Sequence, residues 1–241
     1  MIGWRARLGF LLPPGNPTVE PEMTALAPPG VSLHFNRMVA HGVPGALDGQ
    51  NERTRAMVDN IEASLAMLAL VKPDIIVVAH TATSYYLGRQ GEADLLARLR
   101  NATGIRVITA FGAVVRALQR LRVERVALGA PYAMETTLAG KRHLEAHGFR
   151  VVRCDNLKGV TNIYDETAER AYRLARAVDA EEAEAVFLSG TGMPTVSVLA
   201  ALERDLDKPV ISSASAMMWH ALREAGVREP IAGYGRLLTM A

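Results

Sequence analysis

The stretch Val77-Val78-Ala79-His80-Thr81-Ala82-Thr83-Ser84 decides the fold, because an apolar run ends there in a histidine and small hydroxyl side chains. The stretch Phe187-Leu188-Ser189-Gly190-Thr191-Gly192-Met193-Pro194-Thr195 has the same pattern about 110 residues later. Each apolar run is typical of a buried strand that is followed by a helix. In parallel α/β sheets, ligands bind at the carboxyl ends of the strands. The two stretches therefore predict two similar halves that face one pocket.

The strands expected around these stretches occur in the same order twice. The expected strand starts pair as residue 7 with 125, 31 with 149, 74 with 184 and 105 with 208. The offset within the pairs decreases where the first half carries a glycine- and proline-containing loop, 41–50, and the segment 87–94. Helices are expected between the strands, among them 51–71, 91–100, 136–147 and 196–206. This order predicts an internal repeat of parallel α/β units.

The repeat predicts an α/β protein of two pseudo-symmetric lobes, each a four-stranded parallel sheet flanked by helices, with the site in the cleft between them. We expect residues 1–115 plus 220–241 to form the first lobe and residues 116–219 to form the second. The chain of 241 residues is long enough to give each lobe a core of its own.

Composition excludes several classes of protein. No apolar run reaches the roughly 18 residues of a membrane span, and no signal peptide is visible, so a cytoplasmic protein is expected. The net charge of +2, the scattered basic residues and the 5% aromatic content argue against nucleic acid as a partner. The single cysteine, Cys154, excludes a disulfide within the chain, and we expect it to be inert. A homo-oligomer stays possible.

Neither a cofactor nor a metal is expected. The chain has no phosphate-binding motif of the Walker type and no GxGxxG. His143 and His147 have the i, i+4 spacing of helical metal ligands, but they fall near a predicted helix C-terminus. A solvated or dipole-pairing role is therefore expected for them.

Small polar residues follow four of the predicted strands, and each group precedes a helix. They are Asn16 and Thr18, then Thr81, Thr83 and Ser84, then Tyr132, Thr136 and Thr137, and finally Thr191 and Thr195. Helix N-termini offer free backbone N–H groups and favour anions, and glycines such as Gly190 let the backbone approach a ligand. The pattern predicts a small mono- or dicarboxylate between the lobes. The alternative is that these hydroxyls serve only as helix caps.

His80 is the candidate for acid–base chemistry, because its imidazole stands at the end of the third strand beside Thr81. The alternative is a neutral histidine that is bonded to the backbone or to a neighbouring hydroxyl. Tyr132 is the candidate donor to a developing oxyanion, and its alternative is an aromatic residue at the rim of the pocket.

Three pieces carry a resemblance to a known family over nearly the whole chain. They are Pro13-Pro14-Gly15-Asn16-Pro17-Thr18-Val19-Glu20-Pro21-Glu22, the two strand-end stretches, and Gly233-Tyr234-Gly235-Arg236-Leu237-Leu238. The chain resembles the aspartate/glutamate racemase superfamily, nearest its maleate isomerase and arylmalonate decarboxylase branch. The resemblance implies two flavodoxin-like lobes and two cysteines that face the substrate from opposite sides. The first of these cysteines falls on His80 and the second on Gly190, so this chain has neither.

The resemblance further implies carboxylate binding by a set of residues. They are Asn16, Thr81, Tyr132, Ser189, Gly190, Thr191 and, in a looser match, Asn162. We therefore expect a cofactor-independent lyase or isomerase that acts on a small carboxylate through a carbanion or enediolate. Two alternatives stay open: a hydrolase or hydratase in which His80 activates water, and a carboxylate-binding protein that has lost catalysis.

Overall fold

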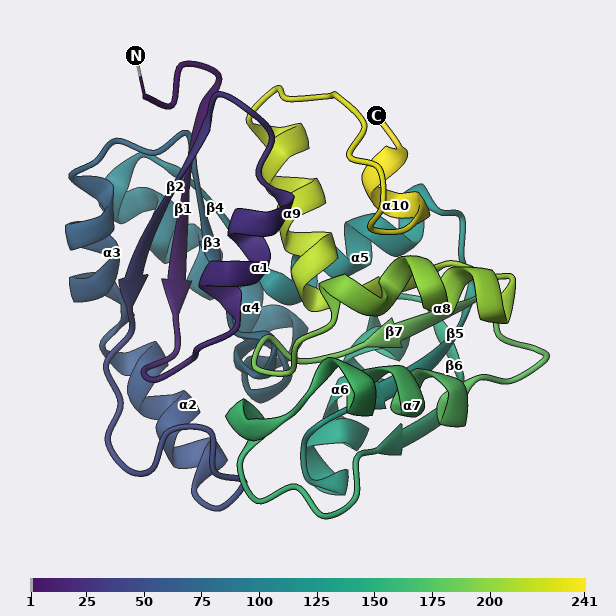
Figure 1. Cartoon of the computed structure of the whole chain (residues 1–241). Coiled ribbons are helices and arrows are strands. Elements are labelled where there is room, and N and C mark those ends of the chain that lie inside the picture. Colours follow the sequence, from purple (N-terminus) through teal and green to yellow (C-terminus); the bar gives the residue numbers. More distant parts are fainter. Residues whose placement is uncertain (1) are drawn as a thin grey trace.

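Two four-stranded parallel sheets form the framework of the computed structural model, which describes residues 2–241. The first sheet contains β1 (Ala6–Leu12), β2 (Val31–Arg37), β3 (Ile75–Val78) and β4 (Arg106–Thr109), in the order β2-β1-β3-β4. The second contains β5 (Arg125–Ala130), β6 (Arg150–Asn156), β7 (Ala185–Leu188) and β8 (Val210–Ser212), in the order β6-β5-β7-β8. The identical order confirms the predicted repeat and the two four-stranded lobes (Figure 1).

Helices cover both faces of each sheet. They are α1 (Val19–Leu26), α2 (Gln50–Asp59), α3 (Ile61–Ala69), α4 (Thr81–Thr103), α5 (Ala110–Arg120), α6 (Met134–Ala146), α7 (Ala168–Val178), α8 (Leu199–Leu206), α9 (Ser213–Glu224) and α10 (Arg236–Thr239). Short 3-10 turns occupy Ile163–Asp165 and Val196–Val198. Within residues 2–241, no helix is both long and apolar enough to cross a membrane.

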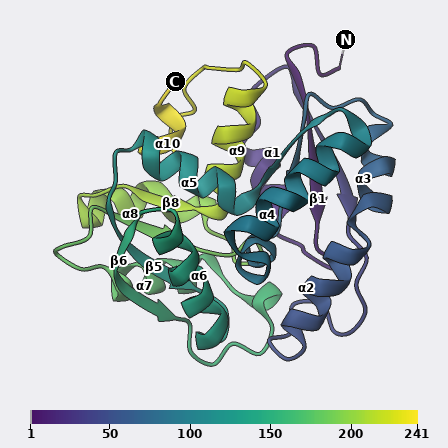
Figure 2. The same ribbon diagram turned by 180° about the vertical axis from the view of Figure 1, so that it is seen from behind.

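The core of the molecule is continuous between the two lobes. One cluster of buried side chains includes Phe10 and Val77 of the first sheet together with Leu128 and Phe187 of the second. Helices α5 and α9 pack against each other between the sheets, as Figures 1 and 2 show from opposite sides. Two smaller clusters fill the outer faces, one beneath α3 and α4 and one beneath α7 and α8. The boundaries that divide the chain at residues 115 and 219 stay a prediction.

Two of the predicted helices are wrong in extent. The helix expected over 51–71 is divided at Asn60, whose φ of −109° and ψ of 7° interrupt the helical backbone between α2 and α3. The helix expected over 91–100 begins much earlier, at Thr81, and it is kinked at Gly88, which has φ 68°. Because α4 begins at Thr81, His80 lies at the N-cap of this helix rather than inside the preceding strand.

The C-terminal segment is anchored to both lobes. The indole Nε1 of Trp219, on α9, donates to the carbonyl of Met240 at 3.1 Å. The backbone N–H of Arg236 donates to the carboxylate of Glu203, on α8, at 2.7 Å. The segment after α9 therefore packs on α9, and it also contacts the second lobe.

Candidate functional site

The ends of β3 and β7 meet between the lobes. Thr191 Oγ1 donates to the carbonyl of Ala79 at 3.0 Å, which joins the segment after β7 to the end of β3. Thr81 Oγ1 donates to Ser213 Oγ at 2.9 Å, and the backbone N–H of Gly190 donates to the same oxygen at 3.2 Å. The two strand-end stretches therefore lie side by side, as their pattern predicts.

The hydroxyls of Tyr85 and Tyr132 lie beside Ser189, at the end of β7. Tyr85, on α4, lies 2.8 Å from Ser189 through their hydroxyl oxygens. Tyr132 is 1% exposed, so it is not an aromatic at the rim. Burial raises the pKa of Tyr132 well above its usual value, although hydrogen bonding with Ser189 and Thr81 opposes this shift. Tyr132 is therefore a protonated hydroxyl at neutral pH, which is the form that donates a hydrogen bond.

Asn16 joins the first lobe to the segment after β7. Its side-chain oxygen accepts from the backbone N–H groups of Thr18 at 2.9 Å and Val19 at 3.0 Å, where α1 begins. Its Nδ2 donates to the carbonyl of Thr191 at 3.2 Å, and Thr18 Oγ1 donates to the carbonyl of Gly192 at 2.7 Å. The amide of Asn16 thus holds two strand-end loops together.

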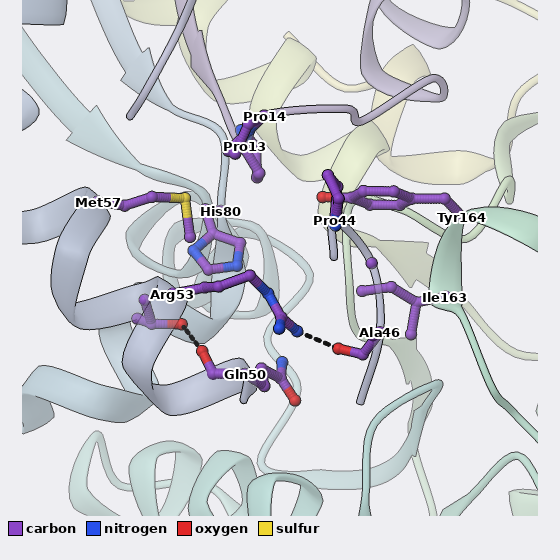
Figure 3. A pocket seen from close by; sticks show the side chains of 12 residues that line it. Pro13, Pro14, Pro44, Ala46, Gln50, Arg53, Met57, His80, Ile163 and Tyr164 are labelled. Atoms are coloured by element: carbon purple, nitrogen blue, oxygen red, sulfur yellow. Dashed lines mark hydrogen bonds between the residues drawn. The ribbon is translucent and has the colours of Figure 1, made fainter. Parts of the chain in front are cut away.

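A cavity of about 30 Å³ lies in front of the strand ends (Figure 3). Its lining residues are Pro13, Pro14, Pro44, Gly45, Ala46, Gln50, Arg53, Thr54, Met57, His80, Ile163 and Tyr164. Among the predicted site residues, His80 lines this cavity. Thr81, Tyr132, Ser189, Gly190 and Thr191 are buried and are not among its lining residues.

His80 is held as a neutral imidazole. Its Nδ1 lies 2.9 Å from the hydroxyl of Thr83. Burial lowers the pKa of His80 to about 4, and the positive charge of Arg53 acts in the same direction. At neutral pH the imidazole is therefore unprotonated, and burial and the charge of Arg53 make it a weak base.

The loop before α2 crosses the cleft and reaches the second lobe. Ile163 donates its backbone N–H to the carbonyl of Gly45 at 2.8 Å, and Asn162 Nδ2 donates to the carbonyl of Pro44 at 2.9 Å. The side-chain oxygen of Asn162 accepts from the backbone N–H of Tyr164 at 2.9 Å. Asn162 therefore anchors this loop and does not line the cavity.

Two cavity residues, Arg53 and Gln50, were not expected from the sequence. Both belong to α2, and Figure 3 places the guanidinium of Arg53 close to the ring of His80. Arg53 donates to the carbonyl of Asp48 at 2.6 Å and to that of Ala46. Nothing in their local pattern marks these two polar side chains as facing inward, because this depends on the loop that folds over them.

A second polar cluster ties α4 to α6 away from the cavity. His143 Nε2 lies 3.0 Å from Glu92 Oε2, and both residues are buried, which corrects the expectation that His143 is solvated. The other oxygen of Glu92 accepts from Ser84 at 2.7 Å and from Thr109. Burial alone raises the pKa of Glu92, but these hydrogen bonds outweigh burial and lower it.

His147 completes a possible set of metal ligands with Glu92 and His143. Their ligand atoms lie within 4.8 Å of one another. The carboxylate oxygens of Glu92 are already engaged by three side chains, and His147 Nδ1 bonds the carbonyl of His143 at 2.8 Å. The carboxylate of Glu92 is therefore already satisfied by protein donors. Cys154, on β6, is half-buried, and burial raises the pKa of its thiol, which lowers the share of the reactive thiolate form.

Comparison with known proteins places this architecture in a family. The chain belongs to the arylmalonate decarboxylase family, whose model matches residues 8–238. It is 31% identical to the maleate isomerase of Nocardia farcinica, over 96% of this chain and 95% of that protein. It is 28% identical to the arylmalonate decarboxylase of Bordetella bronchiseptica, over 95% of each chain. These matches confirm the family branch that the motifs indicate.

Solved structures confirm the fold. The maleate isomerase of Pseudomonas putida S16 with maleate has a TM-score of 0.88 and 23% identity, over 98% of both chains. A cysteine-to-serine mutant of the Nocardia farcinica maleate cis-trans isomerase, with a covalently bound succinylcysteine intermediate, also has a TM-score of 0.88. It is 26% identical and covers 97% of this chain and 98% of its own.

Proposed function

We propose that this chain is a cofactor-independent enzyme that forms a carbanion or enediolate next to a carboxylate of a small acid. Its relatives are maleate isomerases and an arylmalonate decarboxylase, which supports chemistry on small carboxylates. The observation that carries the proposal is the position of His80. Its imidazole lines the cavity between the lobes, directly before Thr81 and the contact between the ends of β3 and β7.

An imidazole takes the place of sulfur in this proposal. The one cysteine of the chain, Cys154, lies on β6, whereas the related Nocardia farcinica enzyme has been trapped as a succinylcysteine intermediate. The family resemblance aligns its two cysteines with His80 and Gly190. A mechanism that adds a thiolate to the substrate therefore has no nucleophile here, and a proton transfer by His80 replaces it.

The proposed step is balanced by proton transfer alone. The C–H bond next to the carboxylate breaks, its electron pair moves onto the carboxylate oxygens, and neutral His80 holds the proton until it returns to carbon. The hydroxyls of Thr81 and Tyr132 stabilise the developing charge. In this proposal Asn16, Ser189, Gly190 and Thr191 complete the carboxylate pocket at the strand ends, behind the residues that line the cavity. Asn162 contributes by anchoring the loop that folds over the cavity. The N–H of Gly190 already donates to Ser213, so a substrate oxygen has to compete with that hydroxyl for it.

Proton NMR in D₂O with a panel of small mono- and dicarboxylates tests the proposal. We expect exchange of a hydrogen next to a carboxylate, and a loss of about 10²-fold or more in the exchange rate for His80→Ala. His41→Ala, at an exposed position of the neighbouring loop, is the control and should leave the rate unchanged. A rate that survives His80→Ala contradicts the proposed role.

The same spectra separate two other functions. Addition of water to the substrate indicates a hydratase, and binding without exchange or product indicates a carboxylate-binding protein. The pH profile adds a second criterion, because kcat/KM reports groups of the free enzyme. We expect kcat/KM to rise through about pH 4, where His80 loses its proton, and to stay level through neutrality. A rise centred near the ordinary histidine pKa contradicts the assignment of His80 as the base.

A further inference from the structure

Two histidines and a glutamate converge where a helix of each half of the chain meets the other. Helix α4 follows β3 of the first sheet, α6 follows β5 of the second, and the two helices contact each other (Figure 2). His143, on α6, and His147, at the C-cap of this helix, lie one turn apart and face Glu92 of α4. Since none of the three residues lines the cavity that contains His80, this cluster is separate from the candidate site.

The ring of His147 is oriented as in a metal ligand. Its Nδ1 lies 2.8 Å from the carbonyl oxygen of His143. A carbonyl only accepts, so Nδ1 carries a hydrogen, and in the neutral ring the lone pair is then on Nε2. Histidines that bind metals commonly donate their other ring N–H to a backbone carbonyl in this way, which fixes the tautomer.

The carboxylate of Glu92 is held with one oxygen toward the histidines. Its Oε1 accepts from Ser84 at 2.7 Å and from Thr109, whereas its Oε2 lies 3.0 Å from His143 Nε2. Burial raises the pKa of Glu92, but these hydrogen bonds outweigh burial and lower it, so the carboxylate is charged at neutral pH. A cation at Oε2 would replace one of the three donors and leave the other two in place.

The separations of the three ligand atoms suit a small tetrahedral ion. With metal–ligand bonds of about 2.0–2.1 Å, two ligands of a tetrahedral zinc ion lie about 3.3 Å apart. The distance from Glu92 Oε2 to His143 Nε2, 3.0 Å, is close to this value. The ligand atom of His147 lies within 4.8 Å of the other two, so it has to move inward by about 1.5 Å at most. His147 ends its helix and is half-buried, which leaves room for this movement.

An aromatic side chain holds both imidazoles in place. The ring of Phe111, on α5, lies with its centroid 4.4 Å from that of His143 and 5.4 Å from that of His147. Packing of this kind restricts the rotation of the two rings, and a site whose ligands are already oriented loses less conformational entropy when it binds an ion.

We propose that Glu92, His143 and His147 bind a divalent transition-metal ion such as zinc, with water as the fourth ligand, and that this ion fastens α4 to α6. Two imidazoles and one carboxylate suit zinc, whereas magnesium and calcium prefer ligand sets made of oxygen alone. The ion takes the place of the hydrogen on His143 Nε2. In a neutral ring this hydrogen moves to Nδ1, and from a protonated ring it is released to solvent.

Titration calorimetry with zinc tests the site, on full-length protein without a histidine tag after treatment with a chelator. We expect one zinc ion per chain with a Kd of about 1 μM or tighter, and no binding of magnesium in the same range. His147→Ala keeps the bond between His143 and Glu92, so the variant should fold, and it should weaken zinc by about 10²-fold. His41→Ala removes an exposed histidine elsewhere and should leave the affinity unchanged.

The same measurements can overturn the proposal. If zinc binds the His147→Ala variant as tightly as the unmodified protein, or if His41→Ala weakens it, the ion is held elsewhere. A Kd of about 100 μM or weaker in the unmodified protein shows that the three side chains are a structural hydrogen-bonded cluster only. Cobalt(II) reports the geometry: we expect the strong visible absorption of a four-coordinate ion, and the weak absorption of a six-coordinate ion contradicts a tetrahedral site.

Thermal unfolding tests whether the ion fastens the two helices. At a free zinc concentration of about 100 times the Kd, the Tm of the unmodified protein should rise by about 5 °C, because the ion binds the folded state. The Tm of His147→Ala should not change under these conditions. Tight binding with no rise in Tm contradicts the fastening of α4 to α6. Because no readout here depends on turnover, these outcomes are independent of the chemistry proposed for His80.

Discussion

The hydroxyl of Ser213 accepts a hydrogen bond from the backbone N–H of Gly190 at 3.2 Å. The same oxygen accepts from Thr81 Oγ1 at 2.9 Å, and Ser213 and Thr81 are fully buried. Ser213 begins α9 directly after β8. One hydroxyl therefore joins the ends of three strands, β3, β7 and β8. Its two hydrogen bonds connect the lobes at the place where the substrate is proposed to bind.

Ser213→Ala should destabilise the protein by about 1–3 kcal/mol, because it leaves two buried donors without their acceptor. Urea unfolding measures this loss in the free energy of unfolding. Ser197→Ala changes an exposed serine of the second lobe and should stay within about 0.5 kcal/mol of the unmodified protein. A Ser213→Ala variant as stable as this control contradicts the bridging role of Ser213.

Gly190→Ala should reduce the stability of the protein by more than the strain of its positive φ alone would. Gly190 has φ +100°, and a Cβ there meets Pro131 at 3.1 Å and the hydroxyl of Tyr132 at 3.2 Å. Gly148 has a similar φ of +90° with nothing within 4 Å, so Gly148→Ala isolates the backbone contribution, which is about 1 kcal/mol. Thermal unfolding of the two variants gives the contribution of close packing as a difference. A cysteine at position 190 meets the same obstruction. Equal losses in the two variants contradict this account.

Removing one partner of the buried Glu92–His143 pair should destabilise the protein strongly. His143→Gln leaves a buried carboxylate with one partner fewer, and we expect a loss of about 3–5 kcal/mol in the free energy of unfolding. The double variant Glu92→Gln/His143→Gln removes the charge and should recover part of this loss. Glu145→Gln breaks an exposed pair with Lys141 on the same helix and should cost at most about 0.5 kcal/mol. No recovery in the double variant contradicts the charge argument.

Glu22 should make stability fall as pH rises toward neutrality. Its carboxylate accepts from the backbone N–H groups of Thr195 at 2.5 Å and Val196 at 2.7 Å. Burial raises the pKa of Glu22 from 4.5 to about 7, although these hydrogen bonds oppose the shift. Between these values the folded protein holds a proton that the unfolded chain has released. The free energy of unfolding therefore decreases from pH 4.5 to pH 7 and then levels off.

Glu22→Gln removes the titrating group and should flatten this part of the stability profile, as measured by urea unfolding at several pH values. Glu20→Gln, on the same helix, should leave the slope in place. A slope that persists in Glu22→Gln shows that another group is responsible.

The fold could be predicted because its signals are local and repeated. The expected strand starts at 7, 31, 74 and 105 lie within one residue of the observed ones, since a buried parallel strand is a short apolar run with clear ends. The start of α4 was missed for a physical reason. Residues 81–85 are buried on all sides between the sheets, so they show no amphipathic period, and Gly88 then kinks the helix.

The candidate site could be predicted only in part. The residues of the strand ends carry their own signal, whereas Ser213, Arg53 and Gln50 function through partners distant in sequence. In Ser212-Ser213, the sequence does not tell which hydroxyl caps α9 and which crosses to Gly190. The role of His143 was wrong because its partner, Glu92, lies on a different helix, 51 residues away.

The shared core between the sheets has a consequence for how a ligand enters. Helices α5 and α9 pack together, and one buried cluster includes strands of both lobes. A hinge motion that separates the lobes would therefore break apolar contacts in the core that they share. The loop over the cavity is fastened to the second lobe by a few hydrogen bonds near Pro44 and Gly45. Amide hydrogen exchange should therefore be much faster in the backbone of that loop and of residues 162–164 than in any strand. On this account, opening of the loop limits the rate at which a ligand enters and leaves.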